Sequence, residues 1–287
     1  MDLPKEVQEL IRMALAEDIG PGDVTARFFV PENARARARV VARETGVLAG
    51  LPVAEAVFRA VDPGLSLTSH KRDGDPLAPG DTVLEIAGST RSLLTAERTA
   101  LNFLQRLSGI ATRTAAGVAA IARAGGRTQL LDTRKTTPGW RWLEKGAVRA
   151  GGGRNHRVGL HDMVMVKDNH LPQSGGLGGL QSSIDAVQAA HPGMRVELEA
   201  DTVEQVRGFL TLRGVDFILL DNMSLEEMRE CVLLAESTGV KLEASGGITL
   251  ERLPEIAATG VDFISSGALT HSVKALDLAL DFEERLA

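Results

Sequence analysis

The arrangement of apolar and polar positions divides the chain into two parts with different rhythms. In the first part, apolar residues from Val7 to Leu15 recur at helical spacing just after Pro4, a favourable residue for a first helical turn. Residues 34–50 alternate small or apolar with charged residues, which is typical of a half-exposed strand. The pattern predicts four further elements here: a helix at 52–61, strands near 65–70 and 82–87, and a long helix at about 90–124.

After the long helix, short apolar strands recur, each followed by a polar tip and then a helix. Continuous apolar strands that alternate with amphipathic helices predict a parallel sheet covered on both faces. About seven such units favour a β/α barrel with fewer than the usual eight strands. A doubly wound sheet is disfavoured because no GxGxxG opens the first helix. The expected strands lie at 128–133, more weakly near 155–160, and at 163–167, 194–200, 216–222, 240–245 and 261–267.

These patterns predict an α/β fold in which an incomplete, about seven-stranded β/α barrel follows an N-terminal α+β sandwich-like domain. We expect the N-terminal domain at residues 1–110 and the barrel at 111–271. The turn-rich stretch that begins at Asp73 is reminiscent of biotinyl or lipoyl carrier folds, without their lysine-bearing hairpin tip, and supports only the sandwich-like architecture. A final helix at 272–287 is expected to pack back on the N-terminal domain.

Composition narrows the possible classes of protein. The net charge of −6 argues against a general nucleic-acid binder, because phosphate binding requires a basic face. No apolar run approaches the roughly 20 residues needed to span a bilayer, and the first residues do not resemble a signal peptide. The single cysteine, Cys231, cannot form an internal disulfide and is expected to be a small buried residue. We therefore expect a soluble cytoplasmic protein.

Basic residues gather at the tips of the expected strands, where β/α barrels place their active sites. Arginine binds carboxylates and phosphates in a bidentate fork, whereas lysine supplies a compact point charge. Each residue alone would be read as a solvated loop cation, but together at neighbouring strand tips they indicate a site for a polyanionic substrate. The residues of this cationic set are Arg134, Lys135, His156, Arg157 and Lys167.

Carboxylates end two neighbouring expected strands, at Glu199 and Asp221. They are candidates to hold Mg²⁺ together with substrate oxygens, or to hydrogen-bond a ribose, because magnesium prefers a few carboxylates, substrate oxygens and water. A structural ion pair inside the barrel is the alternative. Strand alternation places Glu197 on the same face as Glu199. Neither cysteine nor histidine spacing suggests a zinc site.

Two short segments are candidate phosphate holders. Ser245–Gly247 precedes an expected helix start, and Ser266–Ala268 precedes the last expected helix. Glycines let the backbone approach a phosphate, and barrel enzymes often seat one in the loops after late strands.

Several long segments resemble one known family, quinolinate phosphoribosyltransferase, and appear in that family's order from about residue 90 onward. The middle block is the most specific of them. The segments are AERTALNFLQRLSGIAT (96–112), LDTRKTTPGWRWLEKGAVRAGGGRNHRVGLHDMVMVKDNH (131–170), VELEADTVEQ (196–205), ILLDNMS (218–224), EASGGIT (243–249) and GALTHS (267–272). The segment SGGLGGLQSS (174–183) departs from the family by its many glycines.

The resemblance implies transfer of phosphoribosyl from phosphoribosyl pyrophosphate to quinolinate with decarboxylation, in a homodimer or dimer-based hexamer that uses Mg²⁺. It implies that Arg134, His156, Arg157 and Lys167 bind the carboxylates of quinolinate. Arg98 would reach the partner subunit's site. The catalytic set implied to contact phosphoribosyl pyrophosphate and its Mg²⁺ is Lys135, Glu199 and Asp221. The residues implied to hold the ribose 5-phosphate are Ser245, Gly246, Gly247, Ser266, Gly267 and Ala268, with His271 close by. Thr133 is implied to bind substrate as well.

Three other functions stay open at this point. A related transferase with another acceptor would share the scaffold. A barrel aldolase would use Lys167 to form a Schiff base. A silent binding protein would have lost charges at its strand tips, and none of the key positions has lost its charge.

Overall fold

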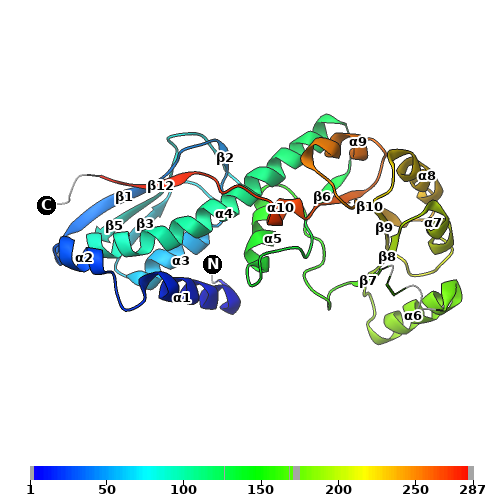
Figure 1. The fold of residues 1–287 in the computed structure, drawn as a ribbon, viewed down its shortest axis with the longest axis horizontal. Coiled ribbons are helices and arrows are strands. Elements are labelled where there is room, and N and C mark those ends of the chain that lie inside the picture. Colours follow the sequence, from blue (N-terminus) through cyan, green and yellow to red (C-terminus); the bar gives the residue numbers. More distant parts are fainter. Residues whose placement is uncertain (1–2, 126, 168, 171–174, 284–287) are drawn as a thin grey trace. The chain divides into compact units, whose positions relative to one another are not determined.

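The computed structural model describes residues 3–125, 127–167, 169–170 and 175–283 (Figure 1). The chain divides into two units. Unit 1 comprises residues 1–115, 136–152 and 270–287, and unit 2 comprises residues 116–135 and 153–269. Among the described residues, no helix is both long and apolar enough to cross a membrane.

Unit 1 contains a four-stranded antiparallel sheet. Its strands follow the order β12 (Leu278–Phe282), β1 (Arg35–Ala42), β5 (Thr82–Ser89) and β3 (Ser66–Ser69). The expected alternation is clear at the start of β1, where Ala36 and Ala38 are buried and Arg35 and Arg37 are exposed. A separate two-stranded antiparallel sheet is formed by β2 (Gly46–Val47) and β4 (Pro76–Leu77).

The helices of unit 1 supply most of its core. Phe58, Leu104 and Leu107 are at most 1% exposed, as are Leu84 and Ile86 on β5. The apolar residues that recur at helical spacing in the sequence thus lie on the buried face of each helix, and burial of this face stabilises the helices. The helices are α1 (Lys5–Ile19), α2 (Val24–Phe29), α3 (Leu51–Val61), α4 (Thr90–Arg123), which continues into unit 2, and α5 (Arg141–Ala150).

The predicted helix at 272–287 is wrong over residues 278–282, which form β12. This strand pairs with β1 from Ala42↔Leu278 to Ala38↔Phe282. The free edge of β1 offers a row of backbone hydrogen-bonding groups, and this tertiary context overrides the local helical pattern. A four-residue helix, α10 (Ala268–His271), precedes this strand, and residues 284–287 lie outside the described part of the chain.

Residues 136–152 differ from the expected division as well, because they group with unit 1 instead of the barrel. Three contacts account for this. Trp140 stacks on Phe103 with ring centroids 4.6 Å apart, and Glu144 lies 3.4 Å from Arg106. The backbone at Gly151 packs so closely on α4 that a Cβ there would lie 2.3 Å from the carbonyl oxygen of Ala111. All three contacts join segments that are distant in the sequence.

Gly151→Ala is therefore expected to destabilise unit 1 by about 1–3 kcal/mol, because α5 would have to move away from α4. Gly146→Ala in the same helix is the matched control. Its Cβ would meet only Arg149 at 3.7 Å, so the free energy of unfolding should hold or rise by about 0.4–1 kcal/mol. Urea denaturation measures both, and equal effects of the two variants would contradict this account.

Unit 2 is an open barrel built on six parallel strands (Figure 1). The mixed α/β fold with an incomplete barrel is thus confirmed. The strand order is β6 (Gln129–Leu131), β11 (Phe263–Ser265), β10 (Lys241–Ser245), β9 (Phe217–Asp221), β8 (Val196–Ala200) and β7 (Val164–Val166). The helices are α6 (Gly176–Ala190), α7 (Val203–Phe209), α8 (Leu225–Ala235) and α9 (Leu253–Ala257), which follows a 3₁₀ turn at Leu250–Arg252.

The weak seventh strand expected near 155–160 is reduced to one parallel bridge, Leu131↔Arg154. The ladder stops there because the next available backbone donor, the N–H of His156, bonds to the buried side chain of Asp132 at 2.9 Å. This change turns residues 155–157 toward the interior of the barrel, next to the pocket described below.

Candidate active site

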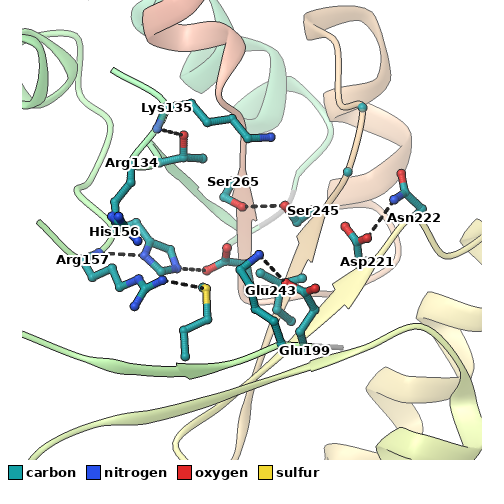
Figure 2. A pocket seen from close by; sticks show the side chains of 16 residues that line it. Arg134, Lys135, His156, Arg157, Glu199, Asp221, Asn222, Glu243, Ser245 and Ser265 are labelled. Atoms are coloured by element: carbon teal, nitrogen blue, oxygen red, sulfur yellow. Dashed lines mark hydrogen bonds and ion pairs between the residues drawn. The ribbon is translucent and has the colours of Figure 1, made fainter. Parts of the chain in front are cut away.

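A pocket of about 490 Å³ lies among the carboxyl-terminal ends of the barrel strands and the loops that follow them (Figure 2). Most of the predicted site residues meet in this pocket. They are Thr133, Arg134, Lys135, His156, Arg157, Lys167, Glu199, Asp221, Ser245, Gly246 and Gly247.

Five predicted residues, Arg98 among them, do not line this pocket. Ser266 is buried, and its hydroxyl donates to the carbonyl of Ile248 at 3.0 Å, so it supports a loop and does not line the pocket. Gly267 and Ala268, which follow it, are also absent from the lining. Ser265, the preceding residue, lines the pocket instead, and its hydroxyl donates to the hydroxyl of Ser245 at 3.1 Å. His271 belongs to unit 1 and contacts Ser272.

Arg98 also belongs to unit 1, where it is an exposed residue of α4. Its side chain is therefore not part of the pocket described above.

The remaining lining residues lie outside the expected substrate-binding set, although Glu243 and Asn222 stand at expected strand ends and strand alternation points to Met165 and Leu219. Residues two positions apart on a strand share a face. Met165, Leu219 and Glu243 stand two positions before Lys167, Asp221 and Ser245, and line the same pocket one layer deeper. Asn222 completes the lining, and its side-chain amide donates to Asp221 at 2.9 Å.

Lys167 and Glu199, which both line the pocket, form an ion pair with Nζ and Oε2 2.9 Å apart. The Nζ of Lys167 donates a hydrogen bond to this carboxylate. Schiff-base chemistry requires a lysine nitrogen that is free to attack a carbonyl. The pair therefore disfavours the aldolase reading of Lys167.

Arg157 is the most buried of the predicted cations, with 8% of its surface exposed. Its guanidinium donates to the carbonyl of Met163 and to the sulfur of Met165, each at 3.4 Å. Burial, and then the nearby charge of Arg134, lower the pKa of Arg157 from its ordinary value. Two cations held together in this way attract an anion that can lie between them.

The loop after β10 brings backbone close to Asp221 and Asn222. Gly246 has φ +94°, and a Cβ there would lie 2.3 Å from the side-chain oxygen of Asn222. Gly247 also has positive φ. Only glycine fits at position 246, and the exposed backbone of this turn suits the close approach of a phosphate.

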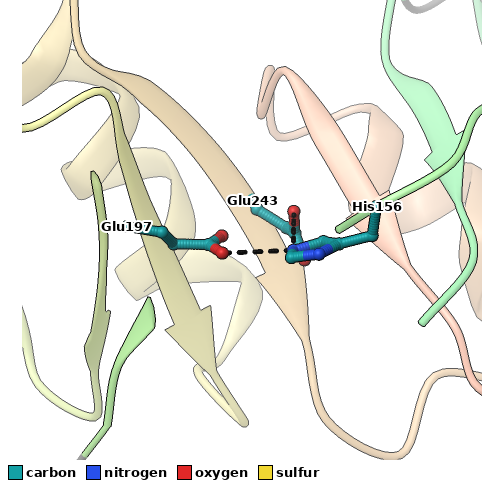
Figure 3. A group of neighbouring side chains, drawn as sticks. All are labelled: His156, Glu197 and Glu243. Atoms are coloured by element: carbon teal, nitrogen blue, oxygen red, sulfur yellow. Dashed lines mark ion pairs between the residues drawn. The ribbon is translucent and has the colours of Figure 1, made fainter. Parts of the chain in front are cut away.

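Beneath the pocket, His156, Glu197 and Glu243 form a buried cluster (Figure 3). Nε2 of His156 lies 3.1 Å from Glu197 and 3.4 Å from Glu243, and all three side chains are at most 7% exposed. Burial would lower the pKa of His156, but the two carboxylates more than offset this effect and raise the pKa to about 10. Burial raises the pKa of Glu197. Because the three groups are coupled, the proton that they retain in neutral water belongs to the cluster as a whole and not to His156 alone.

An open β/α barrel with cations and carboxylates around one strand-end pocket defines the class of the protein, an α/β-barrel enzyme for a polyanionic substrate. The chain belongs to the quinolinate phosphoribosyltransferase family. The family models "Quinolinate phosphoribosyl transferase, N-terminal domain" and "Quinolinate phosphoribosyl transferase, C-terminal domain" match residues 23–108 and 110–281. The family resemblance inferred from the sequence is thus confirmed.

Similar proteins span nearly the whole chain. It is 43% identical over 276 residues to a probable nicotinate-nucleotide pyrophosphorylase (carboxylating) of Bacillus subtilis, covering 96% of this chain and 93% of that protein. It is 41% identical over 298 residues to the mitochondrial quinolinate phosphoribosyltransferase (decarboxylating) 2b of Nicotiana tabacum, covering 98% and 84%. The structure of the nicotinate-nucleotide pyrophosphorylase from Francisella tularensis matches with a TM-score of 0.90 and 38% identity over 98% of both chains.

Proposed function

We propose that this protein transfers phosphoribosyl from 5-phosphoribosyl 1-pyrophosphate to quinolinate, with decarboxylation, to give nicotinate mononucleotide, CO₂ and pyrophosphate. This reaction serves the synthesis of NAD. The observation that carries the proposal is the gathering of Arg134, Lys135, Arg157 and Lys167 around one pocket. Two substrates that bear carboxylates and phosphates require such a concentration of positive charge.

The two ends of the pocket suit the two substrates. Arg134, Arg157 and Lys167 come from the side of β6 and β7 and would bind the quinolinate carboxylates. Across the pocket, Asp221 and the glycines of the Ser245–Gly247 turn would hold the ribose and its 5-phosphate, with Lys135 beside the pyrophosphate. In Figure 2, Arg134 and Arg157 lie on one side of the pocket, with Asp221 and Asn222 on the other.

The proposed mechanism needs no protein nucleophile. The bond from the anomeric carbon to pyrophosphate breaks, the ribose ring gains oxocarbenium character, and the quinolinate nitrogen bonds to that carbon. The resulting pyridinium ring then stabilises the electron pair left on C2 when CO₂ departs, and C2 takes up a proton. The protein contributes orientation and fixed charges, which dominate when the substrates supply their own reactivity.

Mg²⁺ is part of the proposal, with Glu199 and Asp221 as its protein ligands. Their carboxylates line the same pocket, and magnesium is held by one or two carboxylates together with substrate phosphates and water. Glu199 already pairs with Lys167, so Asp221 is the more available of the two. The ion would neutralise part of the pyrophosphate charge. Chelation with EDTA should therefore abolish turnover, and excess Mg²⁺ should restore it; unchanged turnover would contradict a magnesium role.

The test of the reaction is incubation with quinolinate, phosphoribosyl pyrophosphate and Mg²⁺, with nicotinate mononucleotide followed by chromatography. Nicotinate replaces quinolinate in the control, because it lacks the carboxylate that is lost. Product from quinolinate alone would support the proposal. Product from neither acceptor, in folded protein, would contradict it and favour a related transferase with another acceptor.

We also propose a homodimer, alone or within a hexamer, in the reducing cytoplasm that the single buried, free Cys231 fits. Arg98 is exposed on α4 of this chain. The same unit exposes two large aromatic side chains on α2, Phe28 at 73% and Phe29 at 83%. Adjacent exposed aromatics of this size are typical of surfaces that become buried in an interface.

A mixture of Arg98→Ala and Lys167→Ala proteins tests whether the sites are shared. Each variant alone should be nearly inactive, because its substitution removes one cation from both sites of the dimer. Mixed dimers that combine both variants would hold one intact site, so about a quarter of the wild-type activity should return after equal mixing if shared sites act independently. Isotope-coded mass spectrometry would verify subunit exchange. Exchange without recovery would contradict a contribution from the partner.

A further inference from the structure

The buried cluster of His156, Glu197 and Glu243 sits one layer below the pocket residues. Glu197 precedes Glu199 by two residues on β8, and Glu243 precedes Ser245 by two residues on β10, so each shares a face with a pocket residue. A second cavity, of about 150 Å³, lies on the other side, and His156, Arg157 and Glu243 line both cavities. The cluster thus separates the substrate pocket from the opposite end of the barrel.

Both ring nitrogens of His156 are engaged. Nε2 faces the carboxylates of Glu197 and Glu243 at 3.1 and 3.4 Å (Figure 3). On the other side of the ring, Nδ1 accepts the backbone N–H of Arg157 at 2.7 Å. An imidazole nitrogen that accepts a hydrogen bond carries no proton, so this contact places the ring proton on Nε2 and leaves the further proton that the coupled cluster retains on a carboxylate.

This arrangement argues against a metal ion, although two carboxylates and an imidazole would otherwise suit one. A histidine that binds a metal through Nε2 needs a free lone pair there, and usually donates its Nδ1–H to a neighbouring acceptor. Here the neighbour of Nδ1 is itself a donor. The tautomer is therefore opposite to that of a metal ligand.

The contacts of His156 lead directly to Arg157. The backbone of His156 is held by Asp132, and its ring is held by the carboxylates. The ring in turn fixes the backbone N–H of Arg157, whose guanidinium lines the substrate pocket. With both nitrogens engaged, His156 has no ring N–H to offer quinolinate in this conformation.

We infer that Glu197 and Glu243 are positioning residues for quinolinate: they hold the ring of His156 and, through it, the cation Arg157. The inference rests on the proposed function. It replaces a direct contact between His156 and the substrate carboxylate with an indirect role for the whole cluster.

Burial of this cluster does not by itself stabilise the fold. Glu197 is fully buried, and in the part of the chain that is described neither of its carboxylate oxygens, nor Oε1 of Glu243, makes a hydrogen bond; the 3.1 Å contact of Glu197 with Nε2 of His156 is an ion pair. Taking such groups out of water is costly, and apolar replacements of buried charges are often neutral or stabilising. Buried carboxylates that lower the stability of the fold in this way are expected where they serve function.

The test compares Glu197→Met, which removes the acceptor, with Glu197→Gln, which keeps an acceptor oxygen. Glu197→Met should raise the quinolinate KM by about tenfold or more, with the phosphoribosyl pyrophosphate KM within about twofold of wild type. Glu197→Gln should rescue the quinolinate KM to within about threefold. Glu230→Gln, an exposed acid of α8 paired with Arg207, is the matched control and should change neither KM.

Nitrogen-15 NMR of the histidine rings supplies a readout that does not depend on activity. Wild type should show His156 with a proton on Nε2 and none on Nδ1, assigned by comparison with His156→Gln, and Glu197→Met should lose this uniform tautomer. If Glu197→Met does not fold, Glu243→Met replaces it.

Two results would overturn the inference: a wild-type His156 protonated on Nδ1, or a folded Met variant with an unchanged quinolinate KM. A wild type with the expected tautomer but no turnover would contradict the proposed function alone.

Discussion

Arg134→Ala is expected to lower kcat/KM for quinolinate by about 10²–10³-fold, which corresponds to about 3–4 kcal/mol of transition-state stabilisation. Arg134 lines the pocket, and its charge adds to the effect of burial in lowering the pKa of Arg157. A forked guanidinium between two substrate carboxylate oxygens supplies both charge and orientation, and its loss removes both. Steady-state kinetics with quinolinate varied at saturating phosphoribosyl pyrophosphate measures the effect.

The stability of the variant should change little, because removing one of two neighbouring cations also removes their repulsion. Arg134→Lys should fall between wild type and alanine, since an ammonium keeps the charge but not the fork. Arg229→Ala, an exposed residue that pairs with Glu226 on α8, should keep full activity. Near-normal turnover of quinolinate by Arg134→Ala would show that the carboxylate role assigned to Arg134 is wrong.

Glu144→Ala is expected to lower the free energy of unfolding of unit 1 by about 3–5 kcal/mol. The carboxylate of Glu144 has no exposed surface, lies 3.4 Å from Arg106, and accepts the backbone N–H and hydroxyl of Thr137 at 3.1 and 2.8 Å. Without it, a guanidinium and two hydrogen-bond donors lose their common acceptor. These partners come from segments more than 30 residues apart in the sequence.

Tryptophan fluorescence in urea measures this loss selectively, because the chain's two tryptophans, Trp140 and Trp142, both belong to unit 1. Glu226→Ala removes an exposed ion pair on α8 and should change stability by less than about 1 kcal/mol. A loss below about 1 kcal/mol in Glu144→Ala would mean that water or another group replaces the carboxylate.

The barrel strands could be predicted from the sequence because each is a local pattern, a short apolar run between a helix and a polar tip. The strand-end pocket followed from that pattern, since a parallel barrel brings all its carboxyl ends together. The features that sequence reasoning missed depend on distant partners. Residues 278–282 form a strand only because β1 has a free edge, and the seventh strand fails because Asp132 takes the N–H of His156.

Within the site, the type of residue was easier to predict than its orientation. The charges at Arg134, Arg157 and Lys167 are visible in the sequence, and the structure places all three in one pocket. The residues that orient the site from the interior of the barrel cannot be identified from the sequence alone. Nothing local shows that His156 turns its ring toward Glu197 and Glu243, or that Ser265 rather than Ser266 faces the pocket.

The pairing of β12 with β1 has a consequence for the order of events during synthesis. β1 ends at Ala42, whereas its partner begins at Leu278, after the entire barrel. A growing chain on the ribosome therefore carries an unfinished sheet with an exposed edge while the barrel residues emerge. Such edges favour mispairing between chains. Nascent unit 1 is thus expected to depend on chaperones until residue 282 leaves the exit tunnel, although the barrel can begin to fold earlier.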